Sequence, residues 1–326
     1  MLNTMAAESS SPLVSVIIVS WNARKYVHEC LESLLQTCSD SNLEIILVDN
    51  ASADGTPEMV EECFPTVKLI REDRNLGFSK ANNIGIRQST GEYVCLVNSD
   101  VRFTNNCIKP MLAFLREHPD VGIMGPKMLT ASQQTTRSTM RFPTVWNMFC
   151  RSVGLDVLFR QSSIPHSQMM SDFDHETTRD VEILNGWFWM LPRAAVDQVG
   201  LLDERFFIYG EDMDWCYRFY KAKKRVVFFA DAEAIHHGGA SSAAAPLRFE
   251  VECLRADGQF YEKHYGLLRR AGLRSIRVVH HMIRATGFGL VSVVWRSGPG
   301  EIKQRFQREA AVLEWLLRGS GSSPSV

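Results

Sequence analysis

The alternation of apolar runs with helical patterns is the feature of this sequence that most limits its fold. The apolar runs are VSVIIVS at 14–20, EIILVDN at 44–50, VKLI at 67–70 and YVCLVN at 93–98. The spacing of apolar residues predicts helices at about 25–38, 57–64, 79–89 and 107–118. Strands that alternate with helices are typical of a parallel sheet covered on both faces. We therefore expect an α/β fold with a mostly parallel, Rossmann-like sheet.

Three of the expected strands end in polar residues. Ser20-Trp21-Asn22 closes the first, Asp49-Asn50 closes the second, and Asn98-Ser99-Asp100 closes the fourth. Ligands of such sheets bind beyond the carboxyl ends of the strands. A single polar strand end is most often a cap, but three of them on one edge indicate a binding site.

The composition excludes several classes of protein. A length of 326 residues exceeds what one hydrophobic core usually covers, so we expect one large domain with an appendage, or two domains. The formal net charge of -1, from 36 basic and 37 acidic side chains, does not indicate nucleic-acid binding. The eight cysteines show no C-x-x-C spacing, which is typical of reduced thiols in a cytosolic protein.

The N-terminus and the middle of the chain are less regular. Residues 1–12 are polar and are expected to form a disordered tail. The apolar run at 13–21 is too short to span a bilayer, and we interpret it as the first strand rather than a signal peptide. Residues 130–180 are rich in polar side chains and are expected to form a long loop region.

The second half of the chain carries an acidic cluster and a histidine pair. An apolar strand is expected within 181–191, followed by a short helix that begins at Pro192. Gly210 is followed by a helix whose first turn contains Glu211, Asp212 and Asp214, where carboxylates favour the helix dipole. The segment 226–241 predicts two short strands that end in a His-His-Gly-Gly turn.

The C-terminal segment is basic. Residues 263–300 contain seven Lys or Arg, three His and no Asp or Glu, interleaved with Leu, Ile, Val and Trp. Two interpretations stay open: a helix that lies on an anionic membrane surface, and a basic helical cap on the domain. Arg284 and Arg296 interrupt the apolar residues too often for a transmembrane span.

Six motifs in a fixed order carry a resemblance to a known family. They are VSVIIVSWN, EIILVDNASADGT, NLGFSKANNIGI, YVCLVNSD, GWFWMLPRAAVDQVGLLDERFFIYGEDMDWCYR and IHHGGAS. In this order they resemble the family 2 glycosyltransferases of GT-A fold, and they are most similar to the rhamnosyltransferase-like branch of bacterial cell-surface polysaccharide synthesis. The resemblance covers 13–241, with a nucleotide-binding half at 13–125 and an acceptor half at 181–241. It leaves 242–326 as a helical, basic extension.

The resemblance implies a nucleotide-sugar donor, a divalent metal (Mg²⁺ or Mn²⁺) and inversion at the anomeric carbon. It favours dTDP-rhamnose as donor and a glycan or lipid-linked glycan as acceptor. It also implies a location in the cytoplasm or on the inner face of the cytoplasmic membrane. The residues of the nucleotide-sugar pocket would be Ser20, Asn22, Asp49, Asn75, Gly77, Asn82, Asn98 and Ser99.

The resemblance also assigns two metal ligands. Asp100 occupies the last position of the family's D-x-D motif, and His236 matches a histidine that can complete the metal shell. Hard divalent cations beside a diphosphate need few protein ligands, so one carboxylate is enough to anchor the ion. Asn98 replaces the first Asp of D-x-D. Its amide oxygen can still bind a metal but contributes no charge, which lowers the expected metal affinity.

Catalysis needs a group that takes the proton of the attacking sugar hydroxyl. Asp212 matches the general base of the family's E-D motif, and its neighbour Glu211 can raise its pKa by charge repulsion. Trp187 and Asp214 are candidates for the acceptor site, since an aromatic face can stack on a sugar ring. The alternative for the acidic cluster is a helix cap exposed to solvent.

Other functions fit the sequence less well. A UDP-hexose or UDP-N-acetylhexosamine donor stays open as an alternative, as does a non-catalytic nucleotide-sugar binding protein. A sugar nucleotidyltransferase would need a Gly-rich loop after the first strand, where SWNARKY stands instead. A processive synthase would need several membrane spans and a Q-x-x-R-W motif, and neither is found.

Overall fold

The computed structural model describes residues 13–159, 168, 170, 173–238, 246–294 and 300–318. The tail expected at 1–12 lies outside these residues. The chain divides into two compact units. The first comprises residues 1–138, 175–207 and 215–238, and the second comprises 139–174, 208–214 and 239–326.

The first unit is built on a mixed, mostly parallel sheet. Its strands are β1 (Val14–Ser20), β2 (Leu43–Asp49), β3 (Lys68–Arg71), β4 (Tyr93–Asn98), β5 (Val101–Phe103), β6 (Val121–Leu129), β7 (Thr135–Thr136), β9 (Arg179–Asp180), β11 (Phe188–Pro192) and β12 (Arg225–His236). The short strand β10 (Ile183–Leu184) is not part of this sheet. The order along the sheet is β3-β2-β1-β4-β11-β6-β12-β5. The first four strands in that order are parallel, whereas β11 runs antiparallel to both neighbours. The predicted α/β sheet is confirmed.

One strand differs from the prediction. Two short strands were expected within 226–241, but β12 is a single strand of 12 residues. Its register against β6 shifts between Phe229 and Glu233. Such an irregularity bends a strand without ending it, and β12 continues beyond the bend to pair with β5. The apolar pattern of the sequence is interrupted at this bend, and the prediction therefore divided one strand into two.

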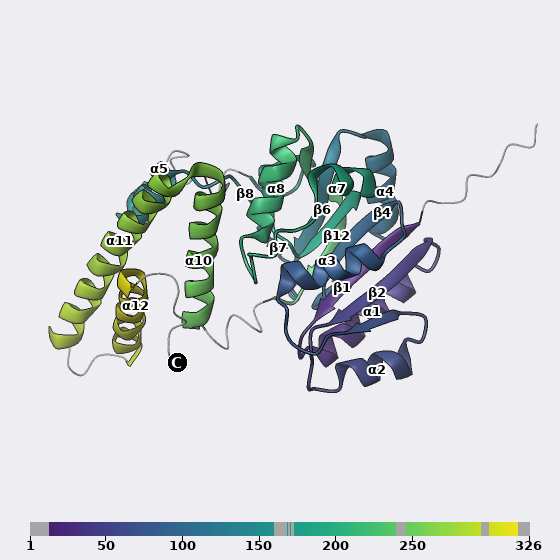
Figure 1. Ribbon diagram of the computed structural model, residues 1–326, viewed down its shortest axis with the longest axis horizontal. Coiled ribbons are helices and arrows are strands. Elements are labelled where there is room, and N and C mark those ends of the chain that lie inside the picture. The colour runs from purple at the N-terminus through teal and green to yellow at the C-terminus, as the bar shows by residue number, and fades with distance from the viewer. Residues whose placement is uncertain are drawn as a thin grey trace, which may run out of the picture. The chain divides into compact units, whose positions relative to one another are not determined.

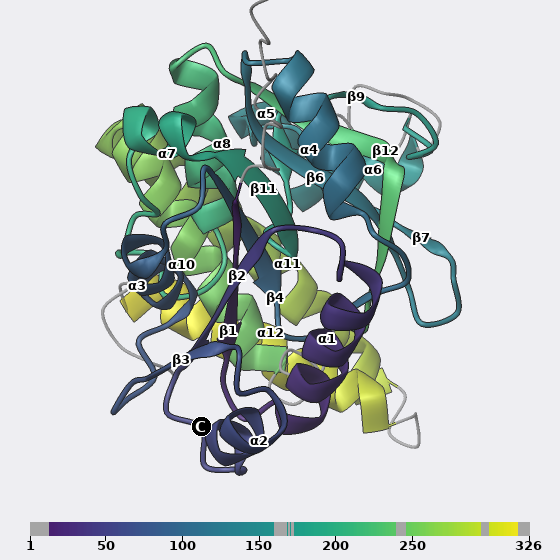
Figure 2. The ribbon, with the colours of Figure 1, turned by 90° about the vertical axis from the view of Figure 1, so that its right-hand side faces the viewer.

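Helices cover both faces of the sheet. They are α1 (Arg24–Thr37), α2 (Thr56–Cys63), α3 (Phe78–Gln88), α4 (Ile108–Glu117), α7 (Arg193–Val199) and α8 (Glu211–Lys221), of which the first turn of α8 belongs to the second unit. Viewed along the sheet, α3 and α7 lie on one side and α1 and α4 on the other (Figure 2). Gly85 lets α3 approach the sheet, because an added Cβ would lie 2.4 Å from Ile17 Cγ2.

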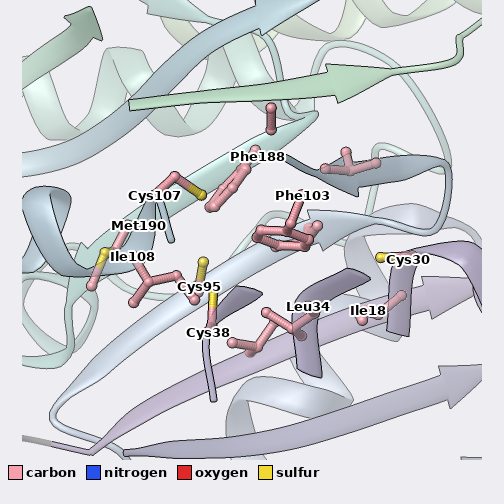
Figure 3. Packing of buried hydrophobic residues seen from close by; sticks show 14 of the residues in the cluster. Ile18, Cys30, Leu34, Cys38, Cys95, Phe103, Cys107, Ile108, Phe188 and Met190 are labelled. Atoms are coloured by element: carbon pink, nitrogen blue, oxygen red, sulfur yellow. The ribbon is translucent and has the colours of Figure 1, made fainter. Parts of the chain in front are cut away.

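The core on the α1 and α4 side contains several cysteines. Cys38, Cys95 and Cys107 are buried there beside Phe103 and Phe188 (Figure 3). Burial raises the pKa of the Cys95 thiol, which keeps it neutral and apolar in character. All eight cysteines are free, so the expectation of unpaired thiols is confirmed.

The second unit is mainly helical. It contains β8 (Thr139–Met140), α5 (Val145–Ser152), α6 (Leu155–Leu158), α10 (Pro246–Tyr265), α11 (Leu267–Val294) and α12 (Gly300–Arg318). The helices α10, α11 and α12 pack on one another around Val251, Val312 and Trp315. Within the described ranges, no helix is both long enough and apolar enough to cross a membrane.

The segment 130–180 was expected to be a loop, and this prediction is partly wrong. It contains the helices α5 and α6. The overall excess of polar residues conceals the short apolar pattern Val145, Trp146, Met148 and Phe149. In α5, Met148 is buried and α11 packs alongside the helix, so tertiary contact stabilises a helix too short to be stable alone.

Candidate active site

Asp100 and His236 lie next to each other at the carboxyl end of the sheet. The strand β5 pairs antiparallel with β12, in a register that sets Val101 opposite His236. Asp100 directly precedes β5, and its Oδ1 lies 3.2 Å from His236 Nε2. Its Oδ2 accepts the backbone N–H of Gly238 at 3.1 Å. The fold thus brings together the two residues predicted to bind a metal.

The chemistry of this pair fits a divalent cation. Burial raises the pKa of Asp100, but the hydrogen bond and charge of His236 outweigh it and leave the pKa below its usual value. The carboxylate is therefore ionised at neutral pH. Its side chain is 22% exposed, so a ligand can reach it. A carboxylate oxygen with an imidazole nitrogen suits Mn²⁺ better than Mg²⁺.

Trp187 packs on the histidine of this pair. The indole and the His236 ring are stacked, with their centroids 4.6 Å apart and an angle of 23° between their planes. The backbone carbonyl of Trp187 accepts the N–H of Asn98 at 2.9 Å, which ties the start of β11 to the end of β4. One face of Trp187 therefore orients His236, and its role toward an acceptor stays a prediction.

Two buried polar atoms mark the ends of β1 and β2. Ser20 and Asp49 are opposite each other in the register of these strands. Asp49 Oδ2 accepts the N–H of Ser52 at 2.9 Å, but its Oδ1 and the Ser20 hydroxyl are buried without a hydrogen-bond partner. A buried polar atom without a partner costs about 1–3 kcal/mol. A ligand with an N–H group can supply the missing donor to Asp49.

Asn50, one of the polar residues at the end of β2, shapes the neighbouring loop, a role that its sequence position did not predict. Its amide nitrogen donates to Asn75 Oδ1 at 3.1 Å and to the carbonyl of Gly77 at 3.2 Å. Its amide oxygen accepts the N–H of Leu76 at 2.8 Å. Its position directly after Asp49, at the end of an apolar run, was the available signal.

Gly77 must be glycine for two reasons. Its φ of +82° lies in the region that other residues rarely adopt, and an added Cβ would lie 2.4 Å from the Phe207 carbonyl oxygen. That carbonyl accepts the N–H of Phe78 at 2.7 Å. The predicted pocket residues Asn75 and Gly77 thus belong to a loop that is held on two sides.

The other predicted pocket residues differ in their surroundings. Asn22 is exposed, and its Oδ1 accepts the N–H of Ala53 at 2.7 Å. Asn82 is buried, and its Nδ2 donates to the carbonyl of Phe78 at 3.0 Å. The amide of Asn22 thus links two loops, whereas that of Asn82 bonds within its own helix α3. Asn98 and Ser99 are partly exposed at the end of β4.

The acidic cluster lies in the second unit, at the first turn of α8. Burial raises the pKa of Asp212 to about 6, and the charge of Asp257 adds to this effect. Burial raises the pKa of Glu211 well above its usual value, and the charge of Asp212 raises it further. Glu211 Oε2 is buried without a hydrogen-bond partner. Asp212 is therefore the carboxyl of this pair that ionises near neutral pH.

Asp214, the third acid of the cluster, is fully buried. Its Oδ1 lies 2.7 Å from Lys263 Nζ and 2.7 Å from His264 Nε2, both at the end of α10. The arrangement anchors the first turn of α8 to α10. An acceptor-binding role was predicted for Asp214, and its exposure of 0% favours a positioning role instead.

A second cluster in this unit was missed. Glu250, His281 and Glu309 lie close enough together to hold a metal ion. However, Glu309 already lies 2.7 Å from His281 Nδ1 and 2.7 Å from Arg284 Nε. Burial raises the pKa of Glu309, but these two partners lower it to about 2. We interpret the cluster as an ion-pair network that joins α11 to α12.

Comparison with known proteins identifies the family. The family described as Glycosyl transferase family 2 matches residues 15–198, more than half of the chain. An N-acetylglucosaminyl-diphospho-decaprenol L-rhamnosyltransferase of Mycobacterium tuberculosis is 27% identical over 253 residues, which cover 72% of this chain and 79% of that protein.

Solved structures share the fold. The mannosyltransferase PcManGT of Pyrobaculum calidifontis, in complex with GDP-Man and Mn²⁺, matches with a TM-score of 0.53 and 17% identity, covering 94% of this chain and 88% of the other. GalNAc-T7 with UDP, GalNAc and Mn²⁺ matches with a TM-score of 0.54 and 16% identity, covering 83% of this chain and 55% of the other. The predicted GT-A fold is thereby confirmed. The chain is a glycosyltransferase and belongs to glycosyl transferase family 2.

Proposed function

We propose that this glycosyltransferase transfers rhamnose from dTDP-rhamnose to a hydroxyl of a glycan or lipid-linked glycan, with inversion at the anomeric carbon. One observation carries the proposal. The edge of the sheet that bears the Asp100–His236 pair also bears a buried oxygen of Asp49 that lacks a hydrogen donor. A cation at the pair suits a diphosphate, and the imide N–H of a thymine suits Asp49. The name of the M. tuberculosis relative supports rhamnose and a lipid-linked acceptor.

Different residues would perform the separate steps of the proposed reaction. Asp212 takes the proton of the acceptor hydroxyl while that oxygen bonds to the anomeric carbon. The bond from that carbon to the diphosphate oxygen breaks, and its electron pair leaves with the nucleoside diphosphate. A single displacement of this kind inverts the anomeric configuration. A divalent cation held by Asp100 and His236 would neutralise the leaving diphosphate.

A different donor base or sugar is the alternative. Uracil carries the same imide N–H as thymine, so the free oxygen of Asp49 favours a UDP-hexose or UDP-N-acetylhexosamine equally. The choice between these sugars depends on a few pocket side chains, and rhamnose is supported by the resemblance of the motifs and by the name of the M. tuberculosis relative.

We also propose which segment of the chain binds each substrate. Residues 13–125 would bind the nucleotide, 181–241 would bind the acceptor, and 242–326 would form the helical extension. In this scheme the exposed part of Trp187 is available to an acceptor sugar, and Asp214 holds the first turn of α8. A lipid-linked acceptor would bring the enzyme to the inner face of the cytoplasmic membrane.

The first experiment is thermal unfolding with a panel of nucleotide sugars, each with and without Mn²⁺. A donor at 100 times its Kd should add about 2.7 kcal/mol to the free energy of unfolding. We expect a shift with dTDP-rhamnose that Mn²⁺ increases. The variant Asp49→Asn should lose the shift, whereas the exposed Asp73→Asn should keep it. A shift with a UDP-sugar alone would exclude rhamnose, and no shift with any member would contradict the proposed donor site.

A further inference from the structure

The outward side of α11 is apolar although its inward side carries charge. Leu273, Arg277, His281 and Ala285 repeat every four residues and are buried in the helical unit. The opposite stripe is exposed and contains Leu268, Val279, Met282, Ile283, Leu290 and Val294. Leu268 and Val294, near its two ends, are 87% and 86% exposed. A helix packed on a globular protein in water shows the opposite pattern, with its apolar residues toward the core and its charged residues toward the solvent.

The helix α5 extends this apolar surface. It packs alongside α11 (Figure 1). The carbonyl oxygen of Ser152 lies 3.0 Å from His280 Nδ1. Among the α5 side chains whose burial is described, the exposed ones are again apolar: Trp146 is 53% and Phe149 41% exposed, and the following Val153 is 44% exposed. Together these residues and the exposed stripe of α11 form what we call the α5–α11 face. Exposed apolar surface of this kind marks an interaction site.

The charge of the extension indicates the partner. Residues 242–326 contain 13 Lys or Arg and 7 Asp or Glu, so their net charge is 13 − 7 = +6. A second copy of the chain docking through this face would bring two such excesses of positive charge together. Anionic lipid headgroups would instead neutralise them. An indole ring beside aliphatic side chains also suits the boundary between headgroups and acyl chains.

We propose that the α5–α11 face binds an anionic lipid bilayer, with α11 lying in the membrane surface rather than crossing it. The inference deepens the proposed function, because a lipid-linked acceptor is met at such a surface. It does not depend on the identity of the donor. Arg277 and Arg284 are already paired with Asp257 and Glu309, so they hold the helix in its orientation and leave the apolar stripe outward.

The test is flotation of the full chain with vesicles of phosphatidylcholine alone and of phosphatidylcholine mixed with phosphatidylglycerol. We expect binding to the mixed vesicles, weakened but not abolished by salt. The double variant Trp146→Gln/Ile283→Gln should bind at least about tenfold more weakly, since it removes two apolar side chains that would be buried in the bilayer. Both residues are exposed, so the fold should be retained.

The control variant is Tyr220→Gln, a change at a large exposed side chain of α8 outside the face. It should float like the unmodified chain. Equal binding of the double variant, or no binding to either vesicle, would overturn the inference. A dimer in sedimentation that the double variant abolishes, without vesicle binding, would assign the face to a second copy. The thermal shift with the donor should be the same in all variants, so failure here and failure of the proposed function are distinguishable.

Discussion

The first turn of α8 and the end of β4 each carry a carboxylate with a role in the proposed reaction. Their surroundings shift the pKa values of these two carboxyl groups in opposite directions. Asp100, at the sheet, has an imidazole 3.2 Å away, and its pKa is lowered in spite of burial. Asp212, on the helix, has the acids Glu211 and Asp257 around it, and burial raises its pKa to about 6. A helix N-terminus alone would lower the pKa of a carboxyl, so burial outweighs the dipole here.

The difference between the two pKa shifts suits two different roles, cation binding by Asp100 and proton transfer by Asp212. A carboxylate that stays ionised attracts a cation, and a carboxyl with a pKa near the working pH exchanges protons efficiently. The sheet achieves the first by pairing an acid with a base across β5 and β12. The helix achieves the second mainly by burying the carboxyl of Asp212, and the charge of Asp257 makes a smaller contribution. The following predictions test whether these environments separate binding from proton transfer.

The largest expected effect follows from removing the base. Asp212→Asn should lower kcat by roughly 10²–10⁴, the usual contribution of a general base, with the donor Kd unchanged. Steady-state kinetics and calorimetric titration measure the two quantities. Glu211→Gln is the control, because burial favours the protonated form that Gln resembles, and it should retain most activity. If Glu211→Gln instead lowered kcat more than Asp212→Asn did, the proton transfer would be assigned to Glu211.

The next largest effect should come from Asp100. Asp100→Asn removes the charge that attracts the cation, and we expect kcat/KM to fall by about 10–100-fold with a loss of Mn²⁺ stimulation. Activity against Mn²⁺ concentration measures this. Asp73→Asn, at an exposed site, should behave like the unmodified enzyme. An Asp100→Asn enzyme that keeps its full response to Mn²⁺ would remove Asp100 from the metal site.

The pH dependence of kcat provides a sharper comparison. Asp212 accepts a proton only when ionised, so kcat should rise about tenfold per pH unit below pH 6 and level off above it. The measurement is kcat at saturating donor and acceptor between pH 4.5 and pH 8, over which kcat should change about 30-fold. An acidic limb near pH 4 would mean that the base has an ordinary carboxyl pKa and that the buried turn does not tune it.

The smallest expected effect is on stability. Since the pKa of Asp212 is 3.8 when unperturbed and about 6 in the fold, the unfolded chain releases this proton first. The free energy of unfolding should therefore fall as the pH rises from about 4 to 6. Asp212→Asn should remove this loss and be more stable by roughly 2–3 kcal/mol above pH 6, at about 1.4 kcal/mol per unit of pKa shift. Equal stability of both proteins at pH 4 and pH 7 would contradict the raised pKa.

The candidate site residues could be selected from the sequence because short-range rules apply to them. Each of the three acidic residues has a local sequence signal. Asp49 and Asp100 lie at the end of an apolar run, and Asp212 follows a glycine that precedes a helix. The contribution of Asn50 was not predictable, since its three hydrogen bonds go to a loop more than 20 residues away. The position of Trp187 against His236 likewise depends on strands that are distant in the sequence.

The sequence by itself determined the strand and helix order, the family motifs and the identity of the acidic residues, because periodicity and spacing are local properties. Only the tertiary structure decided which groups became neighbours. The register of β5 on β12 set His236 beside Asp100. The packing of α10 placed Lys263 and His264 on Asp214, and the packing of α11 turned its apolar stripe outward. Burial and pKa depend on such long-range contacts, which no local pattern encodes.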